Sequence, residues 1–189
     1  MAGTDRIVRA APATTAALVV AAVGIATILG AWFFQFGLGY VPCPLCYQQR
    51  IPYYVGIPLA LLVAFASGRR SPRGVILAGL AALALIMLWG AGIAIYHAGV
   101  EWRWWAGPAD CAGAFGAMGP ASDLAKQLEN VRIVRCDEAA WRFLGISLAG
   151  YNAAISLALA AVAAWGLMRT LRPARATGTA SRYQPSTFR

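Results

Sequence analysis

Four cysteines are the residues of this chain best suited to carry out chemistry. Two of them, Cys43 and Cys46, form a Cys-Pro-Leu-Cys segment, and the other two, Cys111 and Cys136, lie in a later polar stretch. Two thiols at the first spacing can close a disulfide across one helical turn, and a thiol at a helix N-terminus or beside a cation forms a reactive thiolate. The segment therefore predicts thiol–disulfide exchange.

Two other interpretations of the cysteine pair remain open. A Cys-x-x-Cys segment can also be a structural disulfide or half of a metal site. A zinc site of four cysteines usually shows two close pairs, whereas Cys111 and Cys136 are far apart in the sequence. The second pair therefore favours a disulfide that closes a loop, and no metal site is predicted.

The composition predicts an integral membrane protein. Hydrophobic residues make up 60% of the chain and charged residues only 12%, and the mean hydropathy is +0.61. Four apolar segments, about residues 10–36, 46–66, 74–96 and 146–168, are each near the roughly 20 residues that cross a bilayer as a helix. The first is longer than the core of a secretory signal. We therefore expect an all-α bundle of four transmembrane helices.

The basic residues predict how the bundle is oriented. Most arginines precede the first helix, separate the second from the third or follow the fourth: Arg6, Arg9, Arg69, Arg70, Arg73, Arg169, Arg172, Arg175, Arg182 and Arg189. The loops on the other side, about residues 37–45 and 97–145, carry no charge or nearly balanced charge. By the positive-inside rule, both termini are expected to be cytoplasmic.

This orientation places all four cysteines outside the cytoplasm, where disulfides form and persist. In a bacterium it predicts the cell inner membrane, with the cysteines on the periplasmic side. The net charge of +9 then follows from attraction to the anionic inner leaflet of the membrane. The distribution of the arginines therefore does not favour binding to nucleic acid.

Residues 1–172 are predicted to form one membrane redox domain, and residues 173–189 a disordered cytoplasmic tail, because the tail lacks apolar periodicity. Glycines and prolines around Cys111 predict a mobile segment. Residues 122–134 carry apolar side chains at helical spacing. They predict a short interfacial helix that rests on the membrane or packs against its own loop.

Arg50 follows Cys46 by one helical turn and lies just inside the expected membrane surface. An arginine at this depth can simply extend its guanidinium to the lipid headgroups. Beside the cysteine pair, it can instead hold a carbonyl oxygen of a membrane-soluble electron acceptor. Arg50 and the positive end of the helix dipole would also favour a thiolate on Cys46.

The ordered set of motifs resembles the DsbB family of disulfide bond formation proteins. The stretches that carry the resemblance are Cys43-Pro44-Leu45-Cys46-Tyr47-Gln48-Gln49-Arg50, Arg135-Cys136-Asp137 and Trp141-Arg142-Phe143-Leu144-Gly145. Together with the four apolar segments they cover about residues 10–168. The resemblance implies a quinone-dependent protein-disulfide oxidoreductase, that is, a membrane thiol oxidase.

The resemblance implies a relay between two disulfides, Cys43–Cys46 and Cys111–Cys136. A soluble periplasmic thioredoxin-like oxidase, similar to DsbA, would attack the second disulfide at Cys111 in its reduced form. Cys136 would pass the electrons to Cys43, and Cys46, freed beside Arg50, would reduce ubiquinone or menaquinone. A quinone pool is oxidising enough to drive this sequence.

The only histidine of the chain, His97, is expected at the outer end of the third helix. Imidazoles exchange protons near neutral pH, and the resemblance implies a histidine in this region. His97 is therefore a candidate proton donor to reduced quinone, and His97→Ala is expected to weaken quinone use. An interfacial histidine with an ordinary hydrogen bond remains the alternative.

Two other classes of protein share part of this pattern. A vitamin-K-epoxide-reductase-like enzyme is also linked to quinone, but its loop cysteines would precede the Cys-x-x-Cys segment, and the order is reversed here. A non-enzymatic membrane scaffold would use the cysteines only to staple its loops. That scaffold predicts that all four cysteines stay oxidised whatever quinone or partner is offered.

Overall fold

The computed structural model describes residues 2–69, 71–108, 132–133 and 135–172. Its long helices are α1 (Ala2–Trp32), α3 (Ile51–Gly68), α4 (Arg73–Glu101) and α6 (Leu148–Leu171), with a π-helical end of α1, η1 (Phe33–Gly37), and a short α2 (Pro44–Gln48). Four segments are long and apolar enough to cross a membrane: Ala11–Gly37, Pro44–Gly68, Arg73–Glu101 and Leu148–Leu171. The predicted four-helix membrane bundle is confirmed.

Three predictions fall mainly outside the described residues. These are the mobile segment around Cys111, the disordered tail at residues 173–189 and the interfacial helix at residues 122–134. Of that helix only residues 132 and 133 are described, and they form a β-strand. The third transmembrane helix is also longer than predicted, because α4 continues to Glu101 and includes His97.

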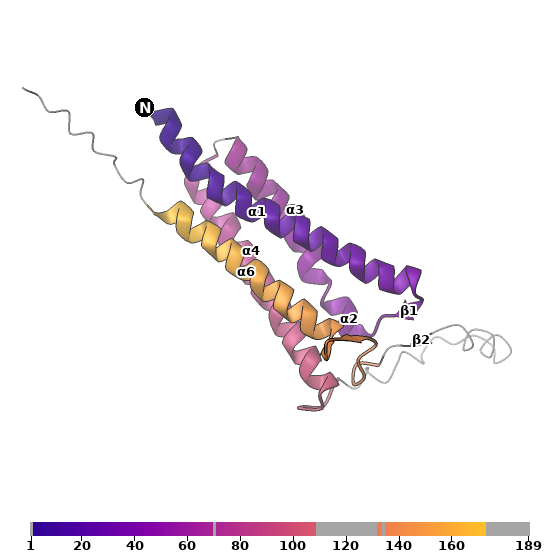
Figure 1. The fold of residues 1–189 in the computed structure, drawn as a ribbon. Helices are drawn as coiled ribbons and strands as arrows, with labels where there is room; N and C mark the ends of the chain where they lie inside the picture. Colours follow the sequence, from indigo (N-terminus) through magenta and orange to yellow (C-terminus); the bar gives the residue numbers. More distant parts are fainter. Residues whose placement is uncertain (1, 70, 109–131, 134, 173–189) are drawn as a thin grey trace, which may run out of the picture.

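The helices pack in the order α1, α3, α4, α6, and α6 returns to α1 (Figure 1). Tyr53, Leu80, Leu83 and Met87 lie in the core, almost without exposed surface. Large apolar side chains such as Leu85 face outward, as expected where lipid tails replace water as the solvent. The bundle is therefore held together by close packing between helices rather than by exclusion of water.

The predicted second helix is interrupted at Gln49 and Arg50, where α2 ends and α3 begins. Pro52 occupies the first turn of α3, a position at which its missing amide hydrogen costs nothing. The Arg50 amide bonds to Tyr47 O at 3.0 Å, a shorter-range contact than a regular α-helix makes. The interruption releases two polar side chains between the helices, next to the cysteine pair.

A two-residue parallel ladder joins the two loops that carry the cysteines. Strand β1 (Tyr40–Val41) pairs with β2 (Arg132–Ile133), with Tyr40 opposite Arg132 and Val41 opposite Ile133. Because the strands are parallel, the chain leaves both of them at the same end of the ladder. Cys43 and Cys136 follow their strands by a few residues and are therefore delivered to one place.

A hairpin leads into the last helix. Strands β3 (Arg142–Phe143) and β4 (Ile146–Ser147) pair in antiparallel fashion. Both turn residues have positive φ angles, 49° at Leu144 and 82° at Gly145, as a tight two-residue hairpin turn requires. Ser147 then caps α6 by accepting the Gly150 amide at 3.2 Å. The positive φ angle of the turn thus explains why glycine, Gly145, ends the Trp-Arg-Phe-Leu-Gly motif.

The other end of the bundle carries the beginning of α1 and the end of α6, opposite the strands and the cysteines (Figure 1). There Arg73, at the start of α4, donates to the carbonyl oxygens of Thr170 and Leu171, each at 2.7 Å. A cation at a helix C-terminus stabilises its unpaired carbonyls. This contact ties α4 to α6 at the end remote from the site.

Close packing of α1 on α6 generates a stability prediction. A Cβ atom at Gly166 would lie 2.5 Å from the Ala16 Cβ and 3.5 Å from Pro12 O, and neither atom can rotate away. We expect Gly166→Ala to destabilise the protein by about 1–3 kcal/mol, seen as a lower thermal unfolding midpoint in detergent. Gly92→Ala is the matched control, since nothing lies within 4 Å of its added Cβ. Equal midpoints for the two variants would contradict this packing.

Candidate active site

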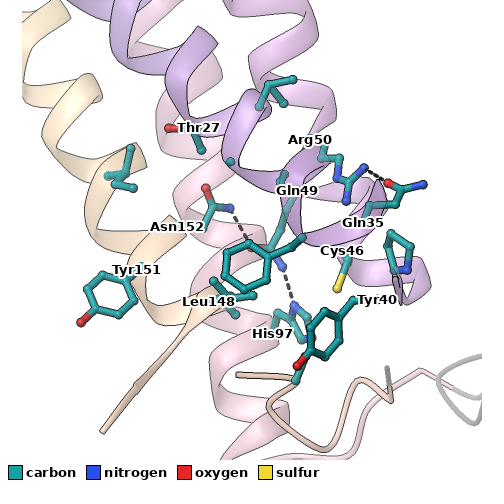
Figure 2. Close-up of a pocket in the computed structure, with 18 of the residues that line it drawn as sticks. Thr27, Gln35, Tyr40, Cys46, Gln49, Arg50, His97, Leu148, Tyr151 and Asn152 are labelled. Atoms are coloured by element: carbon teal, nitrogen blue, oxygen red, sulfur yellow. Dashed lines mark hydrogen bonds between the residues drawn. The ribbon is translucent and has the colours of Figure 1, made fainter. Parts of the chain in front are cut away.

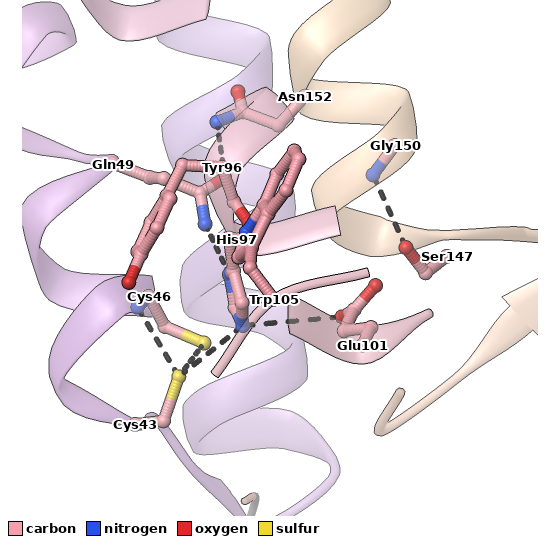
Figure 3. Close-up of polar contacts among 10 residues, drawn as sticks. All are labelled: Cys43, Cys46, Gln49, Tyr96, His97, Glu101, Trp105, Ser147, Gly150 and Asn152. Carbon is pink, nitrogen blue, oxygen red and sulfur yellow. Dashed lines mark hydrogen bonds and ion pairs between the residues drawn. The ribbon is translucent and has the colours of Figure 1, made fainter. Parts of the chain in front are cut away.

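The cysteine pair sits at the start of α2. Cys43 is the N-cap residue, with extended backbone, and Pro44 occupies the first turn. Cys43 and Cys46 are thiols, and their sulfur atoms lie 2.7 Å apart. The Cys46 amide also donates to Cys43 Sγ at 3.2 Å. The helix start thus directs both a thiol and a backbone donor at the Cys43 sulfur (Figure 3).

Cys136 comes from the second loop and lies against this pair. Its side chain has 0% exposure and packs with Cys43, Leu45 and Val100. The Cys136 sulfur, the Cys43 sulfur and a ring nitrogen of His97 all lie within 4.8 Å of one another. Cys136 is disulfide-bonded, and Cys111 lies outside the described residues. The two loops therefore bring together sulfur atoms that are remote in the sequence, in a buried apolar cluster.

The hydrogen bonds around Cys43 change its acidity. The bond from the Cys46 thiol is the main reason why the pKa of Cys43 is lowered to about 5, although burial opposes this change. His97 and the Cys46 amide lower the pKa further. The sequence predicts a reactive thiolate on Cys46. While both residues are thiols, the structure instead directs the donors at Cys43, because Cys43 and not Cys46 caps the helix.

A cavity of about 300 Å³ opens between α1, α3, α4 and α6 beside Cys46 (Figure 2). Most of its wall is apolar, with Ile28, Ala31, Phe34 and Ile155 among the lining residues. The polar groups on the wall include Gln35, Cys46, Gln49, Arg50, His97, Glu101 and Asn152. Three predicted site residues, Cys46, Arg50 and His97, therefore meet at one cavity, and Cys43 lies directly behind Cys46.

Arg50 is held in place at the wall of this cavity. Only 9% of the residue is exposed. Its Nη1 donates to Gln35 Oε1 at 2.6 Å, and its guanidinium lies 5.3 Å from the centre of the Tyr47 ring. Gln35 belongs to η1, so the π-helical turn at the end of α1 supplies the partner. The arginine is buried and oriented rather than extended to the lipid headgroups.

His97 is 3% exposed and lies between two kinds of partner (Figure 3). Its Nδ1 is hydrogen-bonded to the Gln49 side-chain amide. On the other side of the ring, Nε2 lies 3.8 Å from Cys43 Sγ and 3.9 Å from Glu101 Oε1. His97 is therefore a buried group that contacts Cys43.

Sequence reasoning missed the polar residues that surround His97. Asn152 donates to Gln49 Oε1 at 2.7 Å, and the Tyr53 hydroxyl donates to Asn152 Oδ1 at 2.6 Å. Glu101 is buried, and its Oε2 has no hydrogen-bond partner in the part of the chain that the structure describes. Polar and ionisable residues within transmembrane helices are unusual and often functional, so Asn152 and Glu101 carried a signal that could have been used.

Comparisons with known proteins match this chain to one family. The family model described as "Disulfide bond formation protein DsbB" matches residues 13–166. A protein of Marinobacter nauticus named disulfide bond formation protein B is 32% identical over 152 residues, which cover 76% of this chain and 84% of the relative. A protein of the same name from Saccharophagus degradans is 28% identical over 159 residues, or 81% of this chain and 92% of the relative.

A third relative of that name, from Aromatoleum aromaticum, is 32% identical over 136 residues, or 69% of this chain and 76% of the relative. No solved structure gives a significant match. The matched region includes most of each of the four long helices, together with the Cys-x-x-Cys pair, Arg50, His97 and Cys136. This multi-pass membrane protein therefore belongs to the DsbB family of disulfide bond formation proteins.

Proposed function

We propose that this protein reoxidises a soluble periplasmic thioredoxin-like oxidase, similar to DsbA, and passes the electrons to a membrane quinone. One observation carries the proposal. The Cys43 sulfur lies beside Cys136 from the second loop, whereas its partner Cys46 lines the apolar cavity between the helices. The cysteine pair thus connects a loop disulfide with a site inside the bundle, as an electron relay requires.

The first steps are thiol–disulfide exchanges. The reduced partner attacks a Cys111–Cys136 disulfide at Cys111, which leaves Cys136 as a thiolate. Cys136 then attacks Cys43 in the Cys43–Cys46 disulfide, so that a Cys43–Cys136 bond forms, the Cys43–Cys46 bond breaks and Cys46 leaves as a thiolate. The close approach of the Cys43 and Cys136 sulfurs and their burial among apolar side chains support this transfer.

The thiolate on Cys46, as expected from the sequence, belongs to this later stage. Once Cys43 is bonded to Cys136, the Cys46 thiol no longer has a thiolate beside it. Arg50 lines the same cavity as Cys46, and a cation near a cysteine favours its thiolate. The two cysteines therefore take the thiolate role in turn, Cys43 in the dithiol and Cys46 in the mixed disulfide.

The residues of the cavity fit a quinone. Ubiquinone or menaquinone supplies, when bound, an acceptor for two electrons and two protons. The apolar wall suits a flat ring, and the guanidinium of Arg50, fixed by Gln35, can donate to a carbonyl oxygen at the end where Cys46 lies. His97 lines the same cavity and can supply a proton there.

The proposed location is the bacterial inner membrane, with both termini in the cytoplasm and the cysteines facing the periplasm. Arg69, Arg73, Arg169 and Arg172 lie at the end of the bundle where α1 begins and α6 ends. This distribution supports a cytoplasmic end. The cysteines at the opposite end then face a compartment in which disulfides persist.

A quinone-reduction assay tests the proposed relay. Purified protein freed of quinone is mixed with a reduced thioredoxin-like oxidase and a ubiquinone analogue, and quinone absorbance is followed. We expect reduction by the wild type and complete loss in Cys46→Ser and in Cys111→Ser, because each removes one sulfur of the relay. No reduction with any quinone by the wild type would instead favour the scaffold with structural disulfides.

The role of Arg50 predicts an effect on quinone affinity. We expect Arg50→Gln to raise the KM for the quinone analogue about 10- to 100-fold, the loss expected for one hydrogen bond from a charged donor. Arg69→Gln, at the other end of the bundle, removes an exposed arginine and is the matched control. An unchanged KM in Arg50→Gln would exclude the guanidinium as a quinone ligand.

The lowered pKa of Cys43 predicts a pH dependence for its alkylation. With the first pair reduced, the thiolate of Cys43 persists at neutral pH and is lost as the pH falls through about 5. Alkylation by iodoacetamide, located by peptide mass spectrometry, should therefore have its midpoint near that pH. Cys46→Ala removes the thiol donor and should move the midpoint upward. A wild-type midpoint near the ordinary thiol value of about 8.5 would refute the assignment.

A further inference from the structure

A chain of buried hydrogen bonds runs from α6 through α3 to His97. The Tyr53 hydroxyl donates its one hydrogen to Asn152 Oδ1 at 2.6 Å. The Ser156 hydroxyl, 2.9 Å from the Tyr53 oxygen, therefore donates to Tyr53. Asn152 Nδ2 donates to Gln49 Oε1 at 2.7 Å. The Gln49 amide nitrogen then faces His97 Nδ1. Tyr53, Asn152 and Gln49 each accept one of these hydrogen bonds and donate another. All the bonds therefore run in one direction, from donor to acceptor, toward His97.

This direction determines which nitrogen of His97 carries the proton. Because Gln49 donates to Nδ1, that nitrogen accepts and is unprotonated, and the proton of the neutral ring is on Nε2. Nε2 faces the Cys43 sulfur at 3.8 Å and Glu101 Oε1 at 3.9 Å. The hydrogen-bond donor of His97 is therefore directed at the thiol pair and at a carboxyl group, not back into the helices.

Most of the hydrogen-bonded residues around His97 are buried, so water cannot take the place of a lost partner. Tyr53 and Ser156 are almost completely buried, as are Gln49 and His97. In such surroundings a lost partner cannot be replaced by water, and a buried polar group without a partner is costly. A group that holds the ring nitrogen of a histidine through a hydrogen bond also fixes its tautomer, as in enzymes with cysteine–histidine pairs.

We propose that Tyr53, Asn152 and Gln49 are positioning residues that hold His97 with its Nε2 proton directed at Cys43, so that His97 stabilises the Cys43 thiolate as it leaves a disulfide. The inference rests on the proposed relay. In the step concerned, a thiolate attacks the Cys136 sulfur of a Cys43–Cys136 disulfide. A new disulfide forms at Cys136, the bond to Cys43 breaks, and Cys43 takes the electron pair as a thiolate.

The state of the cysteines in the structure is the one that follows this step. Cys136 is disulfide-bonded, and Cys43 and Cys46 are thiols. The Cys43 sulfur then lies within reach of three donors: the Cys46 thiol, the Cys46 amide and His97. Of these three donors, only His97 lies outside the cysteine segment. The orientation of its Nε2 proton depends on the hydrogen bonds that run from Asn152 through Gln49 to the ring.

Nitrogen-15 NMR of histidine-labelled protein tests the inference, because the chain contains a single histidine and its two ring nitrogens give separate signals. In the wild type with the first pair reduced, we expect a protonated Nε2 and an unprotonated Nδ1. Asn152→Leu removes the central link and should give a mixture of tautomers. Tyr53→Phe removes only the distal hydroxyl, keeps the ring in the core and should cause a smaller change in the same direction.

The pH midpoint of Cys43 alkylation by iodoacetamide is the second measurement. Losing one hydrogen bond to a charged sulfur corresponds to a midpoint about one pH unit higher, and we expect up to this upward shift in Asn152→Leu and less in Tyr53→Phe. Thr27→Val is the matched control. Thr27 lines the same cavity but donates to Val23 O at 2.8 Å, so its loss should change neither measurement.

Neither measurement uses quinone or the protein partner, so their outcomes are separate from those of the relay. A wild-type ring protonated on Nδ1 would overturn the inference even if quinone reduction is normal. An unchanged tautomer and an unchanged alkylation midpoint in Tyr53→Phe would overturn it as well, and this variant stays informative if Asn152→Leu does not fold. The expected shifts would support the inference even if the wild type failed to reduce quinone.

Discussion

The parallel pairing of β1 with β2 is the constraint on which this site depends. Only two residues of each strand take part, yet they join loops whose cysteines are separated by two transmembrane helices. An antiparallel pairing would send the two chains away from each other, whereas the parallel one lets Cys43 and Cys136 leave the ladder on the same side. So short a ladder has little stability of its own. It therefore relies on the bundle for support.

A second constraint comes from the membrane, which forbids unpaired polar groups at depth. The interruption between α2 and α3 exposes Gln49 and Arg50 to the interior of the bundle, and each has a partner on another helix, Gln35 for Arg50 and Asn152 for Gln49. The same bonds that satisfy these groups also orient the site. An arginine held by a neutral amide keeps its charge available to a ligand, which a carboxylate partner would neutralise.

The sequence predicted the four spans, the cysteines and Arg50 because each depends on local features: length, apolar composition and spacing. It did not predict the ladder, because two-residue strands leave no alternating pattern. It also predicted a thiolate on Cys46, near the start of the second helix. In the structure Cys43 is the N-cap, so the donors converge on the other sulfur. Asn152 was not predicted as a site residue, because a single amide in an apolar helix forms no periodic pattern. Its contacts with Gln49 and Tyr53 exist only once the helices have packed together.

The positions of the two sulfurs explain why a pair with this spacing suits a membrane relay. In the proposed relay, one cysteine of the pair exchanges with the disulfide of the second loop. The other cysteine faces an electron acceptor that enters from the lipid. Cys43, the N-cap residue of α2, has its sulfur beside Cys136 from the second loop. Cys46, one turn later, lies on the wall of the cavity. In the proposed relay, electrons can therefore pass from the loop to the cavity by exchanging one disulfide bond for another.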